Sequence, residues 1–224
     1  MLPLDLARPA GRTLRVLCLG AHSDDIEIGC GGTALQLAAS GAEVHWAVFS
    51  GTPARAEEAR RSARRFLGSG ADRRLILHAF RDGYFPVQLG EVKEACEEVA
   101  ARVRPDVVLT HFREDRHQDH RVLSDLAWNT FRRHLILEYE IPKWDGDLGR
   151  PNLYLPLSAA ETRRKVRLLM EVFASQRSKD WFTEPTFLGL LRLRGIECRA
   201  KSGWAEAFYS RKAVLQLTHR TRKR

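Results

Sequence analysis

The sequence predicts an α/β fold, namely a three-layer α/β/α arrangement around a mostly parallel sheet, in a single domain. Short apolar runs alternate with segments of helical character about 10–15 residues long, as repeated strand–helix–strand units require. The first run, residues 14–20, is apolar almost throughout, which is typical of a parallel strand covered on both faces. A length of 224 residues fits one such domain.

The expected elements alternate along most of the chain. Strands are expected at residues 14–20, 43–49, 73–80, 106–111, 135–141, 153–157 and 205–217. Helices are expected at residues 31–40, 53–67, 90–103, 119–132, 159–175 and 185–194. Gly41 follows the first helix, Pro53 lies in the first turn of the second and Gly68 follows its end, which is the usual placement of these residues.

The domain is expected to span residues 13–217, because no linker or internal repeat divides the chain. Residues 1–12 contain Pro3, Pro9 and Gly11 and are interpreted as an N-terminal lead-in. Residues 218–224 form a basic C-terminal tail.

The composition excludes several classes of function. No apolar run approaches the ~18 residues of a membrane span, and the N-terminus has no signal-peptide pattern, so we predict a cytoplasmic protein. The net charge is +9, concentrated at residues 60–65 and in the tail. A solvated face explains most of it, attraction of an anionic substrate is the functional alternative, and no motif indicates specific nucleic-acid binding. The oligomeric state, including a homo-oligomer, is left open.

The four cysteines do not indicate a disulfide framework or a cysteine-type zinc site. None of them forms a CxxC pair. Cys18 and Cys96 lie within apolar patterns, and we expect both to be small buried hydrophobes.

A first polar cluster, His22, Asp24 and Asp25, directly follows the first strand. A catalytic zinc site needs about three nitrogen or oxygen ligands, and His22 and Asp25 are spaced to reach one ion together. Asp24 would then be a free carboxylate able to accept a proton. A helix N-cap accounts for one aspartate, but not for a histidine beside two carboxylates.

A second cluster, His117-Gln118-Asp119-His120, follows the strand at residues 106–111. Two histidines three positions apart at a helix start project to the same side, so one can complete a metal site and the other can act on an oxyanion or a leaving group. Asp115 and Asp119 are candidates for orienting them. The alternative is a solvated polar loop.

Glycines 29, 31 and 32 lie between the first strand and the first helix. A phosphate-binding loop is one interpretation, but the spacing GCGG is not GxGxxG. Close approach of the helix to the sheet explains these glycines better.

The two clusters also carry a family resemblance. The stretch AHSDDIEIGCGGT resembles the (A/P)HPDDE-x-x-GCGGT signature of the PIG-L/LmbE-like metal-dependent N-acetylglucosamine deacetylases, and PDVVLTHFREDRHQDHRVL resembles their second signature. The resemblance covers about residues 13–125. Ser23 replaces the usual proline and Ile26 the usual glutamate, which indicates a divergent branch and leaves the substrate open.

The resemblance implies a Rossmann-like fold and a zinc-dependent enzyme that hydrolyses the acetamide of an N-acetylated amino sugar. The sugar is expected to be of the GlcNAc type, free or linked to a nucleotide or a glycan precursor. It implies three metal ligands, which are His22, Asp25 and His120. It also implies three catalytic residues: Asp24 as the general base, His117 as the group that stabilises the oxyanion, and Asp119 as the residue that tunes His117. Arg55, Glu58 and Asp82 are placed near the substrate by weaker likeness. The loop at residues 143–147, with Trp144, is a candidate sugar platform.

Three questions stay open at the level of sequence. Fe²⁺ or another divalent ion suits two histidines and one aspartate as well as Zn²⁺ does. The substrate is either an amino sugar or a non-sugar N-acyl compound. The non-hydrolase alternatives are a Rossmann-like nucleotide- or cofactor-binding domain and an interaction module.

Overall fold

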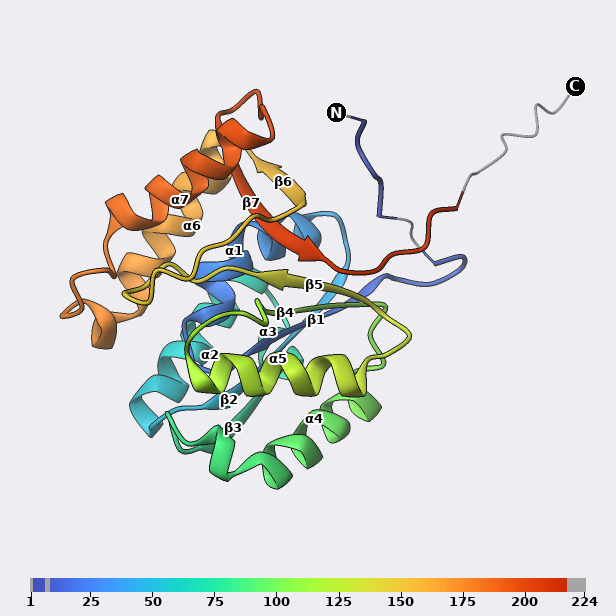
Figure 1. Ribbon diagram of the computed structural model, residues 1–224, viewed down its shortest axis with the longest axis vertical. Coiled ribbons are helices and arrows are strands. Elements are labelled where there is room, and N and C mark those ends of the chain that lie inside the picture. The colour runs from blue at the N-terminus through green and yellow to red at the C-terminus, as the bar shows by residue number, and fades with distance from the viewer. Residues whose placement is uncertain (1, 7–8, 217–224) are drawn as a thin grey trace, which may run out of the picture.

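A computed structural model describes residues 2–6 and 9–216 of the chain (Figure 1). Its strands are β1 Arg15–Gly20, β2 Glu43–Ser50, β3 Leu75–Phe80, β4 Val107–His111, β5 Leu135–Tyr139, β6 Leu153–Leu157 and β7 Trp204–Ser210. Its α-helices are α1 Asp25–Ala39, α2 Pro53–Leu67, α3 Ala71–Arg74, α4 Leu89–Val103, α5 Gln118–Thr130, α6 Ala159–Val172 and α7 Glu184–Glu197, with 3₁₀ turns η1 Phe85–Val87 and η2 Ala174–Gln176. None of the helices in the described part of the chain combines the length and the apolar character needed to cross a membrane.

The strands form one sheet in the order β3-β2-β1-β4-β5-β7-β6. The five strands from β3 to β5 are parallel, and β7 runs antiparallel to both β5 and β6. This confirms the predicted mostly parallel α/β fold. The chain order reverses between β1 and β4, which is the topological switch point where ligands bind in such sheets.

Two hydrophobic cores lie on the two faces of the sheet, which gives the predicted three layers. Side chains alternate along β1, so that Val16 and Cys18 face one core and Leu17 and Leu19 face the other. Helices α4 and α5 cover the second face, and Figure 1 shows them together on one side of the sheet. Cys18 and Cys96 are both buried, as predicted.

The first helix begins earlier than the sequence predicted. Helix α1 starts at Asp25 rather than Gly31, and it is interrupted at Cys30, where φ is −142°. The interruption frees the amides that follow it. Gly32 N and Thr33 N donate to the carboxylate of Glu206 at 2.7 Å each, so they hold a side chain of β7.

The bounds of other elements also differ from the predicted ones. Residues 71–74, predicted in part as strand, form the short helix α3. The predicted strand at residues 205–217 ends at Ser210, because pairing with β5 ends where Ser210 meets Leu137 and pairing with β6 ends at Phe208. Arg211 instead forms an ion pair with Glu138 at 2.6 Å.

The N-terminal lead-in has no helix or strand among its described residues. Its last residue, Arg12, forms an ion pair with Asp106 at 2.5 Å, which ties it to the start of β4. The predicted basic tail at residues 218–224 lies outside the described residues, and the domain limits at 13 and 217 stay predictions.

Candidate metal centre and active site

Two backbone amides fix the conformation of the turn after β1. The amide of His22 donates to Asp25 Oδ2 at 2.6 Å, and the preceding amide, that of Ala21, donates to His111 Nε2 at 3.0 Å. Both bonds are buried. They hold His22 and Asp25 at the carboxyl end of β1, directly beside the end of β4.

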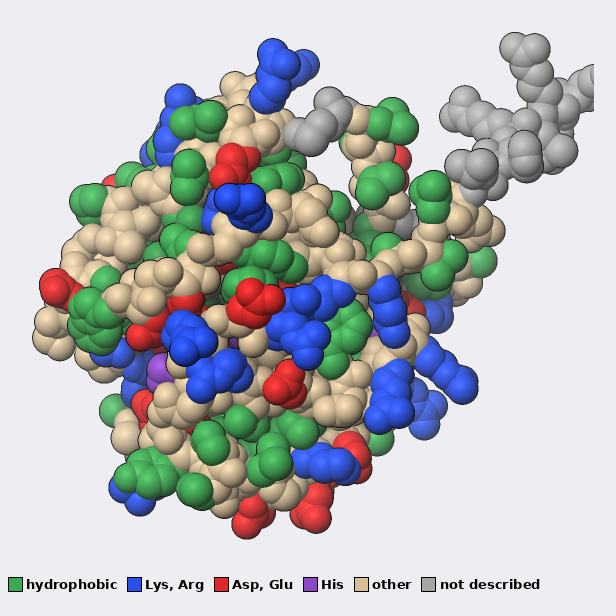
Figure 2. Space-filling model, in the orientation of Figure 1, with side chains coloured by type: hydrophobic (Ala, Val, Ile, Leu, Met, Phe, Trp, Pro, Cys, Tyr) green, Lys and Arg blue, Asp and Glu red, His purple; other side chains and the backbone are tan. Residues whose placement is uncertain are grey.

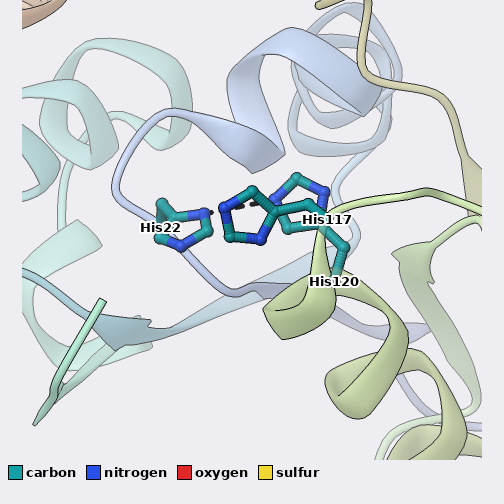
Figure 3. Close-up of side chains that lie close together, drawn as sticks. All are labelled: His22, His117 and His120. Carbon is teal, nitrogen blue, oxygen red and sulfur yellow. Dashed lines mark hydrogen bonds between the residues drawn. The ribbon is translucent and has the colours of Figure 1, made fainter. Parts of the chain in front are cut away.

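The structure brings the three predicted metal ligands together across the switch point. His22 Nδ1 lies 3.1 Å from His120 Nε2 and 3.3 Å from Asp25 Oδ2. His120 Nε2 lies 3.5 Å from Asp25 Oδ1. The two histidines thus approach different oxygens of Asp25. Ligand atoms ~2.1 Å from a tetrahedral ion lie about 3.4 Å from one another, so each of these pairwise separations is close to that value. Figure 3 shows the imidazoles of His22 and His120 facing each other, with His117 beside them.

In each of the two imidazoles, the other ring nitrogen contacts a carboxylate. His22 Nε2 lies 3.1 Å from Asp82 Oδ1 and 3.3 Å from Asp119 Oδ2. His120 Nδ1 lies 2.9 Å from Asp115 Oδ2. Carboxylates in this position fix the tautomer and the orientation of a metal-binding histidine. The residue types of the predicted trio fit a divalent ion. Among the described residues, three groups have one ligand atom per residue, all within 4.8 Å of one another: His22, His117 and His120; Asp25, His111 and His120; and His22, Asp82, His117 and Asp119. The predicted ligands His22, Asp25 and His120 are thus divided between the first two groups.

The electrostatics of the site favour a cation. Burial alone would lower the pKa of His22 and of His120, but the surrounding carboxylates, Asp25 foremost, raise both. Burial opposes ionisation of Asp25, yet the neighbouring imidazoles, with His120 first, hold its pKa well below the usual range. The buried cluster thus attracts positive charge, whether a proton or a metal ion.

Asp119 orients a different histidine from the one predicted. Its carboxylate lies on His22 and accepts hydrogen bonds from the amides of Gly83 at 2.6 Å and Phe85 at 3.0 Å. Only its backbone amide reaches His117, donating to Nδ1 at 3.2 Å. The amides of the loop before η1 hold the carboxylate on His22, so Asp119 acts on His117 through its charge, which opposes the lowering of the pKa of His117 by burial.

His117 is positioned as a hydrogen-bond donor. It is the N-cap of α5, and because Nδ1 accepts from Asp119, a neutral ring carries its hydrogen on Nε2. Burial lowers the pKa of His117, and the adjacent His120 and His22 lower it further, to about 4. The imidazole is therefore neutral near pH 7.

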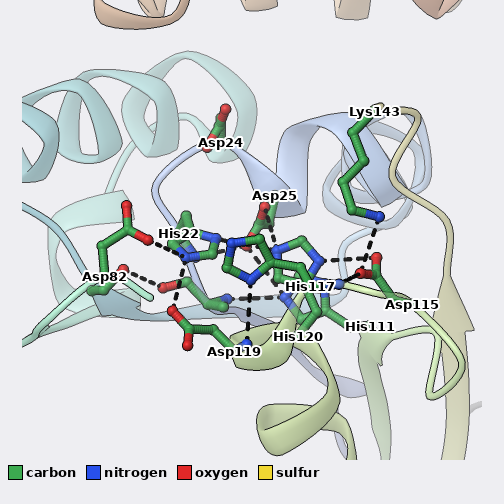
Figure 4. A network of polar contacts seen from close by, with 12 residues as sticks. His22, Asp24, Asp25, Asp82, His111, Asp115, His117, Asp119, His120 and Lys143 are labelled. Atoms are coloured by element: carbon green, nitrogen blue, oxygen red, sulfur yellow. Dashed lines mark hydrogen bonds and ion pairs between the residues drawn. The ribbon is translucent and has the colours of Figure 1, made fainter. Parts of the chain in front are cut away.

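Asp24 lies apart from the imidazoles. Its carboxylate accepts a hydrogen bond from Arg55 Nη2 at 2.5 Å, and Figure 4 shows it pointing away from the histidines. Arg55 therefore lies near the site, as predicted. Glu58, predicted there too, is instead buried and accepts hydrogen bonds from the amide and hydroxyl of Ser175, so it joins α2 to η2. The two residues are three positions apart and therefore lie one turn apart on the same side of α2.

Two residues of the site were not predicted. His111, at the end of β4, is fully buried, lies 3.3 Å from Asp25 Oδ2 and stacks on His120 with ring centroids 3.9 Å apart. It lies within the second signature, and its position at the end of a strand was the signal for it. Lys143 Nζ lies 3.0 Å from Asp115 Oδ1, on the far side of the carboxylate that holds His120 (Figure 4). Nothing in the sequence places Lys143 beside Asp115.

Trp144 is exposed in the loop at residues 143–147. Its side chain is turned outward, with 66% of the residue exposed, and its Nε1 donates to Asp180 Oδ1 at 2.6 Å. The indole is thus held in one orientation. Its role as a sugar platform stays a prediction.

Fold and site together define a Rossmann-like α/β protein with a candidate metal centre at the switch point of its sheet. The profile of the PIG-L family, described as GlcNAc-PI de-N-acetylase, matches residues 17–131, which is more than half of the chain. The uncharacterized deacetylase YaiS of Escherichia coli K12 is 35% identical over 152 residues, covering 61% of this chain and 79% of that protein. The chain belongs to the PIG-L family of deacetylases.

Solved structures share the fold. GalB of Pseudomonas putida KT2440, a 4-carboxy-2-hydroxymuconate hydratase, superposes with a TM-score of 0.73 at 19% identity, over 92% of this chain and all of that one. The N,N'-diacetylchitobiose deacetylase of Pyrococcus horikoshii gives 0.68 at 21% identity, over 91% and 86%. At these identities the likeness concerns the fold alone, and the fold supports more than one reaction.

Proposed function

We propose that this chain is a divalent-metal-dependent N-deacetylase that hydrolyses the acetamide of an N-acetylated amino sugar and releases acetate and a free amine. The observation that supports it most is the convergence of His22, Asp25 and His120 beside a neutral imidazole donor at His117. His22 Nδ1 and His120 Nε2 lie 3.1 Å apart, and each lies within 3.5 Å of one of the two Asp25 oxygens. One polar centre of this kind can activate water and receive an oxyanion.

The metal would be held by His22 Nδ1, His120 Nε2 and an oxygen of Asp25. Zn²⁺ and Fe²⁺ both accept this donor set. A divalent ion supplies Lewis acidity to the water and to the acetyl carbonyl. The carboxylates behind the two imidazoles would keep each ring in the tautomer that presents the ligand nitrogen.

The remaining steps belong to side chains of the chain. Asp24 would accept the proton of the attacking water, after its carboxylate turns from Arg55 toward the substrate. His117 Nε2–H would donate to the oxyanion of the tetrahedral intermediate, because its Nδ1 is already used as an acceptor. Asp119 would act on His22, as its contacts indicate, and so would be a positioning residue.

Substrate contacts would come from Arg55 and Asp82. Both line the site: Arg55 is paired with Asp24, and Asp82 lies 3.1 Å from His22 Nε2 with 66% of its side chain exposed. An exposed carboxylate at this point can accept hydrogen bonds from sugar hydroxyls. The GlcNAc type of substrate, free or joined to a nucleotide or glycan precursor, is supported by the description of the family and by the chitobiose deacetylase with the same fold.

A screen of acetate release tests the proposal. The purified chain would be loaded with Zn²⁺ or Fe²⁺ and offered GlcNAc, N,N'-diacetylchitobiose, GlcNAc 1-phosphate and UDP-GlcNAc. We expect about one ion per chain by elemental analysis and acetate from at least one substrate. His22→Ala and His120→Ala should lose both the ion and the activity.

Two outcomes would contradict the proposal. A metal-free chain that binds a dinucleotide and releases no acetate would favour a cofactor-binding domain. Acetate release from non-sugar N-acetyl amides alone would keep the hydrolase chemistry but reject the sugar substrate.

A further inference from the structure

His111, the last residue of β4, borders the candidate metal centre but takes no part in the proposed reaction steps. Its side chain is fully buried, so it can contact neither a substrate nor solvent. In Figure 2, the histidine side chains that reach this face of the molecule show as small purple patches, the largest of them on the left. Any effect of His111 on the reaction must therefore pass through the groups that it touches.

One ring nitrogen of His111 holds the backbone at the end of β1. The amide of Ala21 donates to His111 Nε2 at 3.0 Å, which joins the end of β4 to the turn after β1. The hydroxyl of Tyr139 lies 3.4 Å from the same nitrogen, but it donates to Leu19 O. A neutral imidazole whose Nε2 accepts a hydrogen bond carries its hydrogen on Nδ1. The amide of Ala21 thus selects one tautomer of His111.

That tautomer matters because Nε2 also lies beside a proposed metal ligand. His111 Nε2 is 3.3 Å from Asp25 Oδ2 (Figure 4). A hydrogen on Nε2 would point at this oxygen and compete with an ion for it. Burial lowers the pKa of His111, and His120 lowers it further, to about 4, although Asp25 and Asp115 oppose the change. The ring is therefore neutral near pH 7 and leaves the negative charge of Asp25 to the ion.

The face of the His111 ring packs on a second proposed ligand. The ring centroids of His111 and His120 are 3.9 Å apart, and the ring planes differ by 15°. At its edge, His120 Nδ1 is held by Asp115 Oδ2 at 2.9 Å. The hydrogen bond fixes one direction within the His120 ring, and the stack fixes the plane of the ring. Together the two contacts aim Nε2 of His120 at the metal site.

We propose that His111 is a positioning residue of the metal centre: its ring fixes the plane of His120, and its Nε2 accepts a hydrogen bond without donating one to Asp25. The proposal rests on the proposed metal-dependent function and deepens it. Outer groups that orient metal ligands typically change metal affinity or activity by roughly 10–100-fold when they are removed. An effect of that size on the bound ion would separate positioning from packing of the interior.

Three variants test this role, each titrated with Zn²⁺ in competition with a chelator. His111→Phe keeps a flat ring but offers no acceptor to Ala21, and we expect the dissociation constant of the ion to rise by roughly 10–100-fold. His111→Gln carries an acceptor without the ring, so it should recover only part of the affinity. His78→Phe is the matched control: the same substitution is made on β3, where the imidazole stacks on Phe49 with ring centroids 5.0 Å apart. It should keep the parental affinity.

Two further measurements respond to positioning but not to packing alone. The visible absorption of the Co²⁺-loaded chain depends on the geometry of the ligands, so it should change in His111→Phe and not in His78→Phe. With a substrate that releases acetate, kcat should fall while KM stays near the parental value, because His111 does not reach the substrate.

Several outcomes would overturn the positioning role. A lower melting temperature in His111→Phe, with parental metal affinity and an unchanged Co²⁺ spectrum, would mean that His111 only packs the interior. If His111→Phe does not fold, parental affinity in His111→Gln would reject the stack on His120. An equal loss of affinity in His78→Phe would mean that any such change in the sheet weakens the site. Because metal binding is measured without turnover, weaker binding in His111→Phe together with no acetate release from the parental chain would reject the proposed deacetylase function and leave the positioning role standing.

Discussion

At the scale of residues, the site depends on which ring nitrogen each histidine presents. His22 turns Nδ1 inward and His120 turns Nε2 inward, and the outward nitrogen of each lies on a carboxylate. A metal ligand must present a lone pair, so the hydrogen has to sit on the outward nitrogen. The aspartates around the imidazoles are therefore as much part of the candidate centre as the ligands themselves.

The substitution Asp24→Asn distinguishes the proposed role of Asp24 as a general base from that of a metal ligand. Asparagine keeps the size of the side chain and can still contact Arg55, but it cannot accept a proton from water. We expect metal content within error of the parent chain and kcat lower by about 10²–10⁴. Elemental analysis and acetate release measured on one preparation check both, and near-parental turnover would remove Asp24 from the mechanism.

At the scale of elements, the glycines of α1 let the helix lie close to the sheet. A Cβ on Gly29 would lie 2.0 Å from Cδ2 of Tyr139, which is fully buried and donates its hydroxyl to Leu19 O at 2.5 Å. A Cβ on Gly32 would lie 2.5 Å from Leu157 Cδ1. The amides freed at Cys30 hold Glu206, whose carboxylate also pairs with the buried Lys165 at 2.6 Å. A side chain of the protein thus occupies the position where a phosphate cradle was considered.

Gly29→Ala tests this close approach. The added methyl must displace either the ring of Tyr139 or α1 itself, which carries Asp25, and overpacking of this kind costs typically 1–3 kcal/mol. We expect a loss of about that size in the free energy of unfolding, measured by urea denaturation. Gly90→Ala in α4 is the matched control, because nothing lies within 4 Å of its Cβ position. It should be neutral or more stable by about 0.5–1 kcal/mol, and an equally small effect at Gly29 would contradict the steric argument.

The same elements show what sequence alone could predict. The apolar runs predicted β1 and β4. Because the carboxyl ends of parallel strands lie at the same edge of a sheet, these runs also predicted the edge where His22, Asp25 and His120 meet. The sequence could not predict which side chains contact one another. The carboxylate of Asp119 lies on His22 rather than His117 because amides of a distant loop fix it, and Glu58 points inward because of where Ser175 lies. The break at Cys30 depends on Glu206, 174 positions from Gly32.

At the scale of the whole molecule, the candidate centre joins two distant stretches of the chain. His22 and Asp25 come from the β1–α1 turn, and His120 comes from the first turn of α5, 98 positions from His22. The two stretches meet only in the folded sheet, so an ion bound by all three residues has little affinity for the unfolded chain. Binding of that kind must add to the stability of the fold.

Removal of the metal should therefore lower the melting temperature. At free metal 100 times the dissociation constant, binding contributes ~2.7 kcal/mol, which corresponds to a shift of roughly 5–10 °C for a chain of this size. The shift should shrink as the pH falls, because the carboxylates raise the pKa values of His22 and His120 and protons then compete with the ion. Differential scanning calorimetry with and without a chelator measures it. His120→Ala is the control, since its melting temperature should not respond to metal; a full response in that variant would place the ion elsewhere in the molecule.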